Sequence, residues 1–176
     1  MRIPGSASSS LVILGAHFDS INSRGGISAR APGAIDNASG TVVLLETLRV
    51  LAASKFTPKV TLEFHFYAAE EGGMKGSKDV FAKYKADGKT VLGMVNTDMA
   101  GYSPSGKISI WTDHVDAALT GYVRLVAEGY TGETTADTCG SSMCSDHNSA
   151  MSNGFRESDF SWGFVEGECA DIFGDG

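Results

Sequence analysis

Short runs of β-forming residues alternate with helical segments along this chain, and that alternation constrains its fold more than any other feature. Residues 11–16, 60–67 and 91–97 are rich in Val, Ile, Leu and aromatic side chains, and polar or Gly-containing segments separate them. Such runs are typical of strands, and the short apolar run at residues 11–16 is typical of a buried one. We expect a fourth, shorter strand at residues 107–111.

Helices are expected between and after these strands. Residues 40–53 are apolar nearly all round, with Glu46 and Arg49 as a polar stripe, so this helix should pack closely against a sheet. The polar residues just before it, 36–39, can cap its start. Two further helices are expected at residues 74–85 and 116–128.

The order of these elements predicts the fold class. Strands that alternate with helices form an α/β three-layer sandwich, with a mostly parallel mixed sheet and helices on both faces. The 176 residues suit one domain, with a core over about residues 11–170, and residues after 129 are Gly-rich and typical of loops. Because a core strand begins almost at once, we expect this domain to lack an upstream segment.

Charge and composition exclude several classes of partner. The chain has 14 Lys and Arg against 21 Asp and Glu, a net charge of -7, so it offers no basic patch for nucleic acid or an anionic membrane. No run approaches the roughly 18 apolar residues of a membrane span, and residues 1–10 lack the apolar core of a signal peptide. The acidic surplus suits a cation, such as a metal ion or the ammonium group of a peptide.

The three cysteines are too few for a disulfide scaffold. Cys139 and Cys144 are close enough in the chain to form a local disulfide, and Cys169 is left over. Two buried thiols are the alternative, since free cysteines are often buried.

Histidine and carboxylate residues follow the predicted strands at equivalent places. His17 follows the first strand, Glu70 and Glu71 follow the second, and Asp98 follows the third, while Asp36 begins the helix after the first strand. Ligand sites in such sheets lie just beyond the carboxyl ends of the strands. We therefore expect these side chains to gather at one edge of the sheet.

Zinc accounts for these residue types, because it binds His nitrogen and carboxylate oxygen. Two zinc ions need a bridging carboxylate and terminal ligands, which points to Asp36 as the bridge and to His17 and Asp98 on one metal. One of the paired glutamates would bind the other metal, and its neighbour would be free to act as a base. Asp19 could accept a hydrogen bond from the second ring nitrogen of His17.

Four motifs resemble those of one enzyme family. They stand in the order seen in the secreted di-zinc leucine aminopeptidases of bacteria and fungi, and the resemblance spans about residues 11–170. The motifs are Gly15-Ala-His-Phe-Asp-Ser20, Ala31-Pro-Gly-Ala-Ile-Asp-Asn-Ala-Ser-Gly40, Ala69-Glu-Glu-Gly-Gly-Met-Lys-Gly-Ser77 and Val95-Asn-Thr-Asp-Met-Ala-Gly101.

The resemblance implies a role for each matching residue. It implies that His17, Asp36 and Asp98 bind one zinc ion, that Asp36 and Glu71 bind the other, and that Glu70 is the general base. Met99 and the segment from Cys144 to His147 resemble walls of the pocket for the N-terminal side chain of the substrate. The implied activity is removal of N-terminal, apolar residues from peptides by an extracellular, monomeric enzyme.

The chain also departs from the family. Four residues separate Cys139 and Cys144 where three are expected, and residues 155–164 are longer and more polar than the family's apolar strand. The family's last zinc ligand is a His near the end of the domain, and this chain has no His after His147. We therefore expect a domain truncated at both ends that binds about one zinc ion firmly and has little activity.

Two other functions fit the same residues. A glutaminyl cyclase resembles these peptidases but uses one zinc for acyl transfer, and an inactive family member would bind little metal. The remaining histidines have ordinary explanations: His65 fits a strand interior, and His114 fits a helix start or the surface. His147 is a weaker candidate for a substitute ligand.

Overall fold

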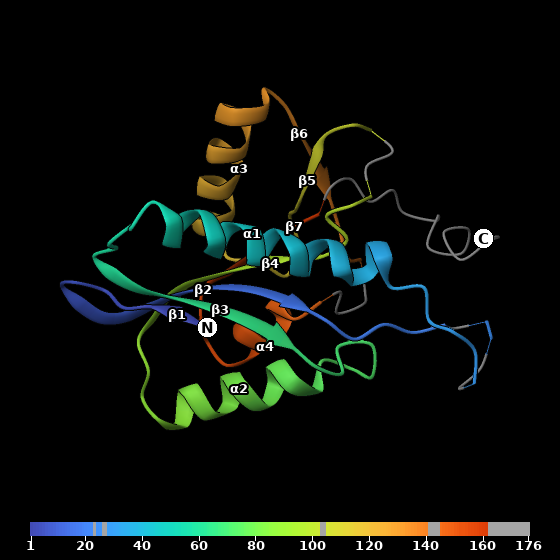
Figure 1. Cartoon of the computed structure of the whole chain (residues 1–176), viewed down its shortest axis with the longest axis horizontal. Coiled ribbons are helices and arrows are strands. Elements are labelled where there is room, and N and C mark those ends of the chain that lie inside the picture. The colour runs from blue at the N-terminus through green and yellow to red at the C-terminus, as the bar shows by residue number, and fades with distance from the viewer. Residues whose placement is uncertain (23, 26–27, 103–104, 141–144, 162–176) are drawn as a thin grey trace.

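The computed structural model describes residues 1–22, 24–25, 28–102, 105–140 and 145–161. Its centre is a seven-stranded sheet in the order β1-β3-β2-β4-β7-β5-β6 (Figure 1). The β2–β3, β2–β4, β4–β7 and β5–β6 pairs are parallel, and the β1–β3 and β5–β7 pairs are antiparallel. The strands are β1 (Arg2–Ile3), β2 (Ser8–His17), β3 (Val60–Tyr67), β4 (Val91–Thr97), β5 (Ile108–Trp111), β6 (Thr134–Asp137) and β7 (Glu157–Ser161).

Helices cover both faces of this sheet. Figure 1 shows α1 (Gly40–Ala53) and α3 (Ala117–Thr131) on one face, and α2 (Lys75–Ala86) and α4 (His147–Ser152) on the other. The predicted three-layer α/β sandwich with a mostly parallel sheet is therefore confirmed. Among the described residues, no helix has the length and apolar character needed to cross a bilayer.

The alternation of side chains along β2 builds a core on each face. Leu11 and Ile13 pack with Phe81 of α2 and Met94 of β4, whereas Leu14 and Ala16 pack with Leu44 of α1. Successive residues of a strand point to opposite faces, so one strand serves both cores. A strand covered on both faces is apolar almost throughout, which is why the sequence pattern of β2 was informative.

The predicted elements up to residue 131 match the structure closely, but the end of the chain differs from expectation. The Gly-rich region contains two strands and a helix, β6, α4 and β7, where we expected loops. Strand β7 is inserted between β4 and β5 in the middle of the sheet. Its sequence, Glu-Ser-Asp-Phe-Ser, lacks the apolar pattern of an interior strand, so the pattern gave no signal.

Helix α1 packs against the sheet as expected, but with only one of its sides. Leu44 is 2% exposed, but its neighbour Leu45 is 44% exposed and Val42 and Val50 are also on the surface. Only one side of the helix meets the sheet, and the described residues place nothing over its outer side. Its apolar composition therefore overstates its burial.

Candidate metal centre

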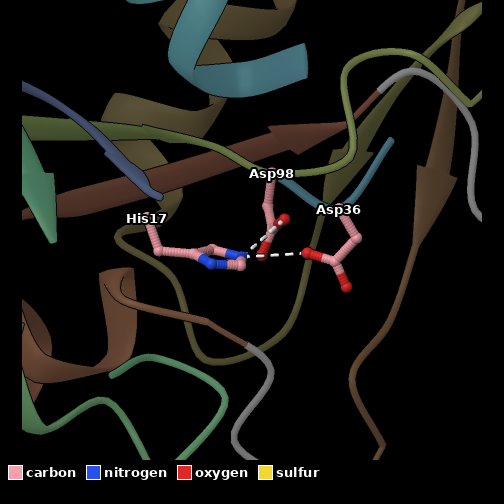
Figure 2. Close-up of side chains that lie close together, drawn as sticks. All are labelled: His17, Asp36 and Asp98. Carbon is pink, nitrogen blue, oxygen red and sulfur yellow. Dashed lines mark ion pairs between the residues drawn. The ribbon is translucent and has the colours of Figure 1, made fainter. Parts of the chain in front are cut away.

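Three side chains from separate segments converge at the carboxyl ends of β2 and β4. Figure 2 shows His17, Asp36 and Asp98 pointing toward one another. The Nε2 atom of His17 lies 3.0 Å from Oδ1 of Asp36 and 3.3 Å from Oδ1 of Asp98. Each residue offers one ligand atom, and these atoms all lie within 4.8 Å of one another. The three therefore form a group of the size and chemistry that holds a metal ion.

Local structure explains why these three residues meet. His17 is the last residue of β2, and Asp98 follows the parallel neighbour β4 directly. Asp36 lies in an irregular helical turn, η1 (Ala34–Ser39), between β2 and α1. The parallel pairing of β2 with β4 brings their carboxyl ends to the same edge.

Asn37 ties the Asp36 turn to the end of β4. Its buried side chain donates from Nδ2 to the carbonyl oxygen of Thr97 (3.0 Å). Its Oδ1 accepts hydrogen bonds from the backbone N–H groups of Gly40 (3.0 Å) and Met99 (3.2 Å). Asn37 was expected only as one of the residues that cap the start of α1, and its bond from Gly40 fits that role. Its bonds to Thr97 and Met99 also fix the position of Asp36 relative to Asp98.

The electrostatics of this group favour a bound cation. Burial of His17 disfavours its charged form, but hydrogen bonds and charge from Asp36 and Asp98 outweigh burial and raise the pKa of His17 to about 12. Apart from the facing Nε2 atom of His17, no described residue offers a hydrogen-bond donor to the buried Oδ1 atoms of the two aspartates. Two orphaned carboxylate oxygens facing one imidazole nitrogen fit a metal ion, which would satisfy all three atoms.

Glu70 and Glu71 lie in the turn after β3, beside this group. Burial, followed by the nearby carboxylate of Asp98, raises the pKa of Glu70 to about 8. Burial, followed by the carboxylate of Asp36, raises the pKa of Glu71 to about 7. Among the described residues, neither glutamate belongs to the group of His17, Asp36 and Asp98. The negative charges of that group nevertheless help to raise the pKa of both glutamates.

Asp19 has a different contact from the expected one. The Nδ1 atom of His17 lies 3.1 Å from the backbone carbonyl oxygen of Asp19, whereas the Asp19 carboxylate is 3.6 Å away. That carboxylate accepts the backbone N–H groups of Glu70 (3.0 Å) and Glu71 (3.2 Å). Asp19 therefore orients His17 through its backbone and holds the glutamate turn through its side chain.

The remaining predicted site residues lie at the margin of the centre or outside the described residues. Met99 is half-buried directly after Asp98 and has a positive φ of 51°. Cys139 is buried and disulfide-bonded. Its expected partner, Cys144, lies outside the described residues, so that pairing stays a prediction.

The other three histidines have partners elsewhere in the structure. His65 lies 3.0 Å from both the Glu63 carboxylate and the Tyr67 hydroxyl. His114 is exposed and lies 3.2 Å from the carbonyl oxygen of Gly140. His147 is fully buried and forms an ion pair with Asp159, with 2.7 Å between Nδ1 and Oδ2.

Behind Asp98 lies a buried polar group that the sequence analysis missed. The hydroxyl of Ser145 donates to Oδ2 of Asp98 (2.7 Å) and accepts from Nδ2 of Asn96 (2.9 Å). The same Nδ2 donates to Asp159 of β7 (3.3 Å). Ser145 lies in a segment expected to form a pocket wall, but its link to Asp98 depends on how β7 inserts into the sheet.

Comparison with known proteins places this fold and site in one family. The model for "Peptidase family M28" matches residues 1–171. The chain belongs to peptidase family M28. This membership confirms the resemblance to aminopeptidases drawn from the four motifs.

Individual relatives agree with the family assignment. A probable leucine aminopeptidase of Arthroderma benhamiae is 48% identical over 162 residues, which cover 89% of this chain and 44% of the relative. The Legionella pneumophila LapA aminopeptidase superposes with a TM-score of 0.80 at 29% identity, over 89% of this chain and 42% of that one. A zinc aminopeptidase from Bacillus subtilis superposes with a TM-score of 0.74 at 28% identity, and the match covers 95% of this chain and 40% of that one. The M28 chain described here thus spans less than half the length of these relatives.

Proposed function

We propose that this M28 chain forms the catalytic centre of a zinc-dependent aminopeptidase that removes N-terminal residues from peptides. The observation that carries the proposal is the convergence of His17, Asp36 and Asp98 beside two carboxyl groups of raised pKa, Glu70 and Glu71. The relatives named as leucine aminopeptidase and as zinc aminopeptidase support it.

The metal would be held by residues from three segments. His17, Asp36 and Asp98 would bind one zinc ion, and Asp36 with Glu71 would bind a second. When bound, zinc lowers the pKa of a coordinated water molecule and polarises a carbonyl oxygen. Because the first site has three ligands from the protein and the second has two, the first should bind zinc more tightly.

Glu70 is the proposed general base. Its carboxylate would take a proton from the attacking water and then give it to the amine nitrogen of the leaving peptide. Without a metal ion, burial, followed by the nearby carboxylate of Asp98, raises the pKa of Glu70 to about 8. A bound zinc ion would lower this pKa, so that Glu70 is ionised and able to take the proton. Asp19, which accepts the backbone N–H groups of both glutamates, would keep Glu70 in place.

The surroundings of the centre suggest its substrate. The charged N-terminus of a peptide is a cation, and the field of several carboxylates would attract it. Met99 would offer an apolar contact to the first side chain, which favours apolar N-terminal residues. A disulfide at Cys139 suits an oxidising compartment, so we propose that the enzyme is extracellular; we also propose that it acts as a monomer.

The variant Glu70→Gln tests the proposed reaction. In a complete, zinc-loaded form of the enzyme this change should lower kcat for a leucine anilide by about 10²–10⁴-fold, because general-base assistance is lost. Zinc content measured by atomic absorption should stay at the wild-type level. Retained activity would remove Glu70 from the role of base.

The substrate assay also separates the peptidase from a glutaminyl cyclase. The peptidase should release the aniline from leucine anilide with a free N-terminus but not from the N-acetylated form, which lacks the N-terminal charge. A peptide that begins with glutamine should be shortened rather than cyclised, as mass spectrometry would show. Loss of ammonia from that peptide, without cleavage, would instead support the cyclase.

A further inference from the structure

A continuous line of buried polar groups connects β7 to Asp98. It begins at the ion pair between His147 of α4 and Asp159 of β7, whose side chains are both 0% exposed. The Asp159 Oδ2 atom accepts from Nδ2 of Asn96 (3.3 Å), and the same Nδ2 donates to Ser145 Oγ (2.9 Å). Ser145 in turn donates to Asp98 Oδ2 (2.7 Å).

The chemistry of Asp159 fixes the direction of every hydrogen bond in this line. The Oδ2 atom of Asp159 lies 2.7 Å from Nδ1 of His147 and acts as an acceptor there, so the Asn96 amide turns its NH₂ group toward the same oxygen. That orientation directs the same NH₂ group at the Ser145 oxygen. Ser145 has a single hydroxyl proton, and with its oxygen already accepting from Asn96 the proton points to Asp98.

The two oxygens of Asp98 therefore have different partners. Its Oδ2 is held by the Ser145 hydroxyl, while Oδ1 has no hydrogen-bond donor among the described residues and faces Nε2 of His17. Hydrogen bonds to a ligating carboxylate commonly orient it for the metal.

We propose that Asp159, paired with His147, is a positioning residue that orients the metal ligand Asp98 through Asn96 and Ser145. Without the Asp159 carboxylate, the Asn96 amide could rotate and present its oxygen to Ser145. The hydroxyl proton would then be drawn to Asn96, and Asp98 Oδ2 would lose its donor. Burial raises the pKa of Asp159, and the ion pair with His147 opposes that rise.

This inference rests on the proposed metal site, and zinc affinity tests it without reference to activity. We would measure the zinc Kd of the apo protein by competition with a chromogenic chelator. The main variant is the double replacement Asp159→Leu with His147→Leu, which removes the pair without leaving an unpaired buried charge. Its zinc affinity should fall about tenfold, within the 10–100-fold range for loss of an outer partner.

A mutant cycle shows whether Asp159 acts through Ser145. Ser145→Ala alone should also weaken zinc binding about tenfold. Adding Ser145→Ala to the double replacement should cause no further loss, because both changes remove the same hydrogen bond to Asp98. Losses that multiply instead would overturn the proposal, since Asp159 would then act independently of Ser145.

Matched controls separate positioning from folding and from charge. Ser158→Ala removes another buried hydroxyl of β7, one that contacts Thr120 (3.1 Å), and should leave the zinc Kd unchanged. Asp159→Asn keeps an oxygen that can accept from Asn96 and should retain most of the affinity. A tenfold loss in Asp159→Asn would show that the charge matters rather than the orientation, and would contradict the proposal.

A last variant covers the case in which the double replacement does not fold, as a thermal melt would show. Asn96→Leu cuts the line in the middle and should reproduce the tenfold loss, whereas wild-type affinity in this variant would overturn the inference. Failure of the proposed function has a different signature, because the wild-type protein itself would then bind no zinc.

Discussion

Strands β4 and β7 are parallel neighbours in the sheet, yet they use polar residues in different ways. In β4 the polar residues Asn96 and Thr97 stand at the carboxyl end, directly before Asp98. In β7 the carboxyl groups of Glu157 and Asp159 are fully buried within the sheet, level with Met94 and Asn96 of β4. One strand therefore delivers a carboxylate to a site, whereas the other buries carboxyl groups inside the protein.

This difference shows what a buried carboxyl group needs. The Asp36 and Asp98 carboxylates face His17 and can be satisfied by a cation. Asp159 has His147 as its partner, but neither oxygen of Glu157 has a hydrogen-bond donor among the described residues. Burial therefore raises the pKa of Glu157 to about 8, so this group retains its proton at neutral pH. Changes at His147, His17, Glu157 and Lys83 test this comparison.

The largest expected effect comes from breaking the buried pair of β7. His147→Leu alone leaves the Asp159 carboxylate buried without its partner and should lower the free energy of unfolding by about 3–5 kcal/mol. Replacing both residues by leucine should restore most of that loss, because no charge is then buried. Urea unfolding measures both values, and equal losses in the single and double variants would contradict this account.

A ligand of the candidate metal centre should affect binding more than folding. His17→Ala should weaken zinc binding by more than the roughly 100-fold upper range for an outer partner. His65→Ala, a change at a half-buried histidine outside the centre, is the control and should leave the zinc Kd unchanged. Calorimetric titration with zinc checks both, and equal losses would show that His17 has no special place in binding.

Glu157 should make stability depend on pH. Its folded pKa of about 8 lies above the ordinary value of 4.5, so the folded state binds the proton more tightly than the unfolded state. The stabilisation of the folded state by protonated Glu157 is complete below about pH 4.5 and is lost as the pH rises through about 8. Glu157→Gln should therefore be more stable than wild type by about 2–4 kcal/mol at pH 8, because the full rise in the pKa of Glu157 from 4.5 to about 8 corresponds to at most roughly 5 kcal/mol at about 1.4 kcal/mol per pKa unit.

Unfolding by urea across this pH range measures the effect of Glu157. At pH 4.5 the glutamine variant and the wild type should have similar stability. Asp79→Asn, at an exposed position of α2, provides a control whose pH profile should follow the wild type. A glutamine variant that kept the wild-type slope would show that Glu157 ionises as freely as a surface residue.

The smallest effect is expected at an ion pair on the surface. Lys83 and Asp87 lie 3.0 Å apart on α2, but their side chains are 72% and 39% exposed. Lys83→Gln should cost no more than about 0.5 kcal/mol, because water already solvates both charges. A loss of several kcal/mol in urea unfolding would remove the distinction between buried and exposed pairs.

The sequence by itself determined the first part of the sheet and the residues of the candidate centre. Strands β2, β3 and β4 are apolar and end at polar residues, so their positions and their carboxyl ends follow from local patterns. His17 and Asp98 were found because each stands at the end of such a strand, and Glu70 because it lies in the turn just after β3. The order of parallel strands then brings these ends together, which pattern reasoning can anticipate.

Only the tertiary structure decided which residues stand behind the centre. Strand β7 has no apolar pattern, and its place between β4 and β5 depends on partners distant in sequence, such as Met94 and Asn96. The line from Asp159 to Asp98 follows from that placement alone. In the same way, α1 is apolar nearly all round, but which of its residues are buried depends on the single face that meets the sheet. Burial and side-chain pairing are properties of neighbours in space, and local sequence does not encode them.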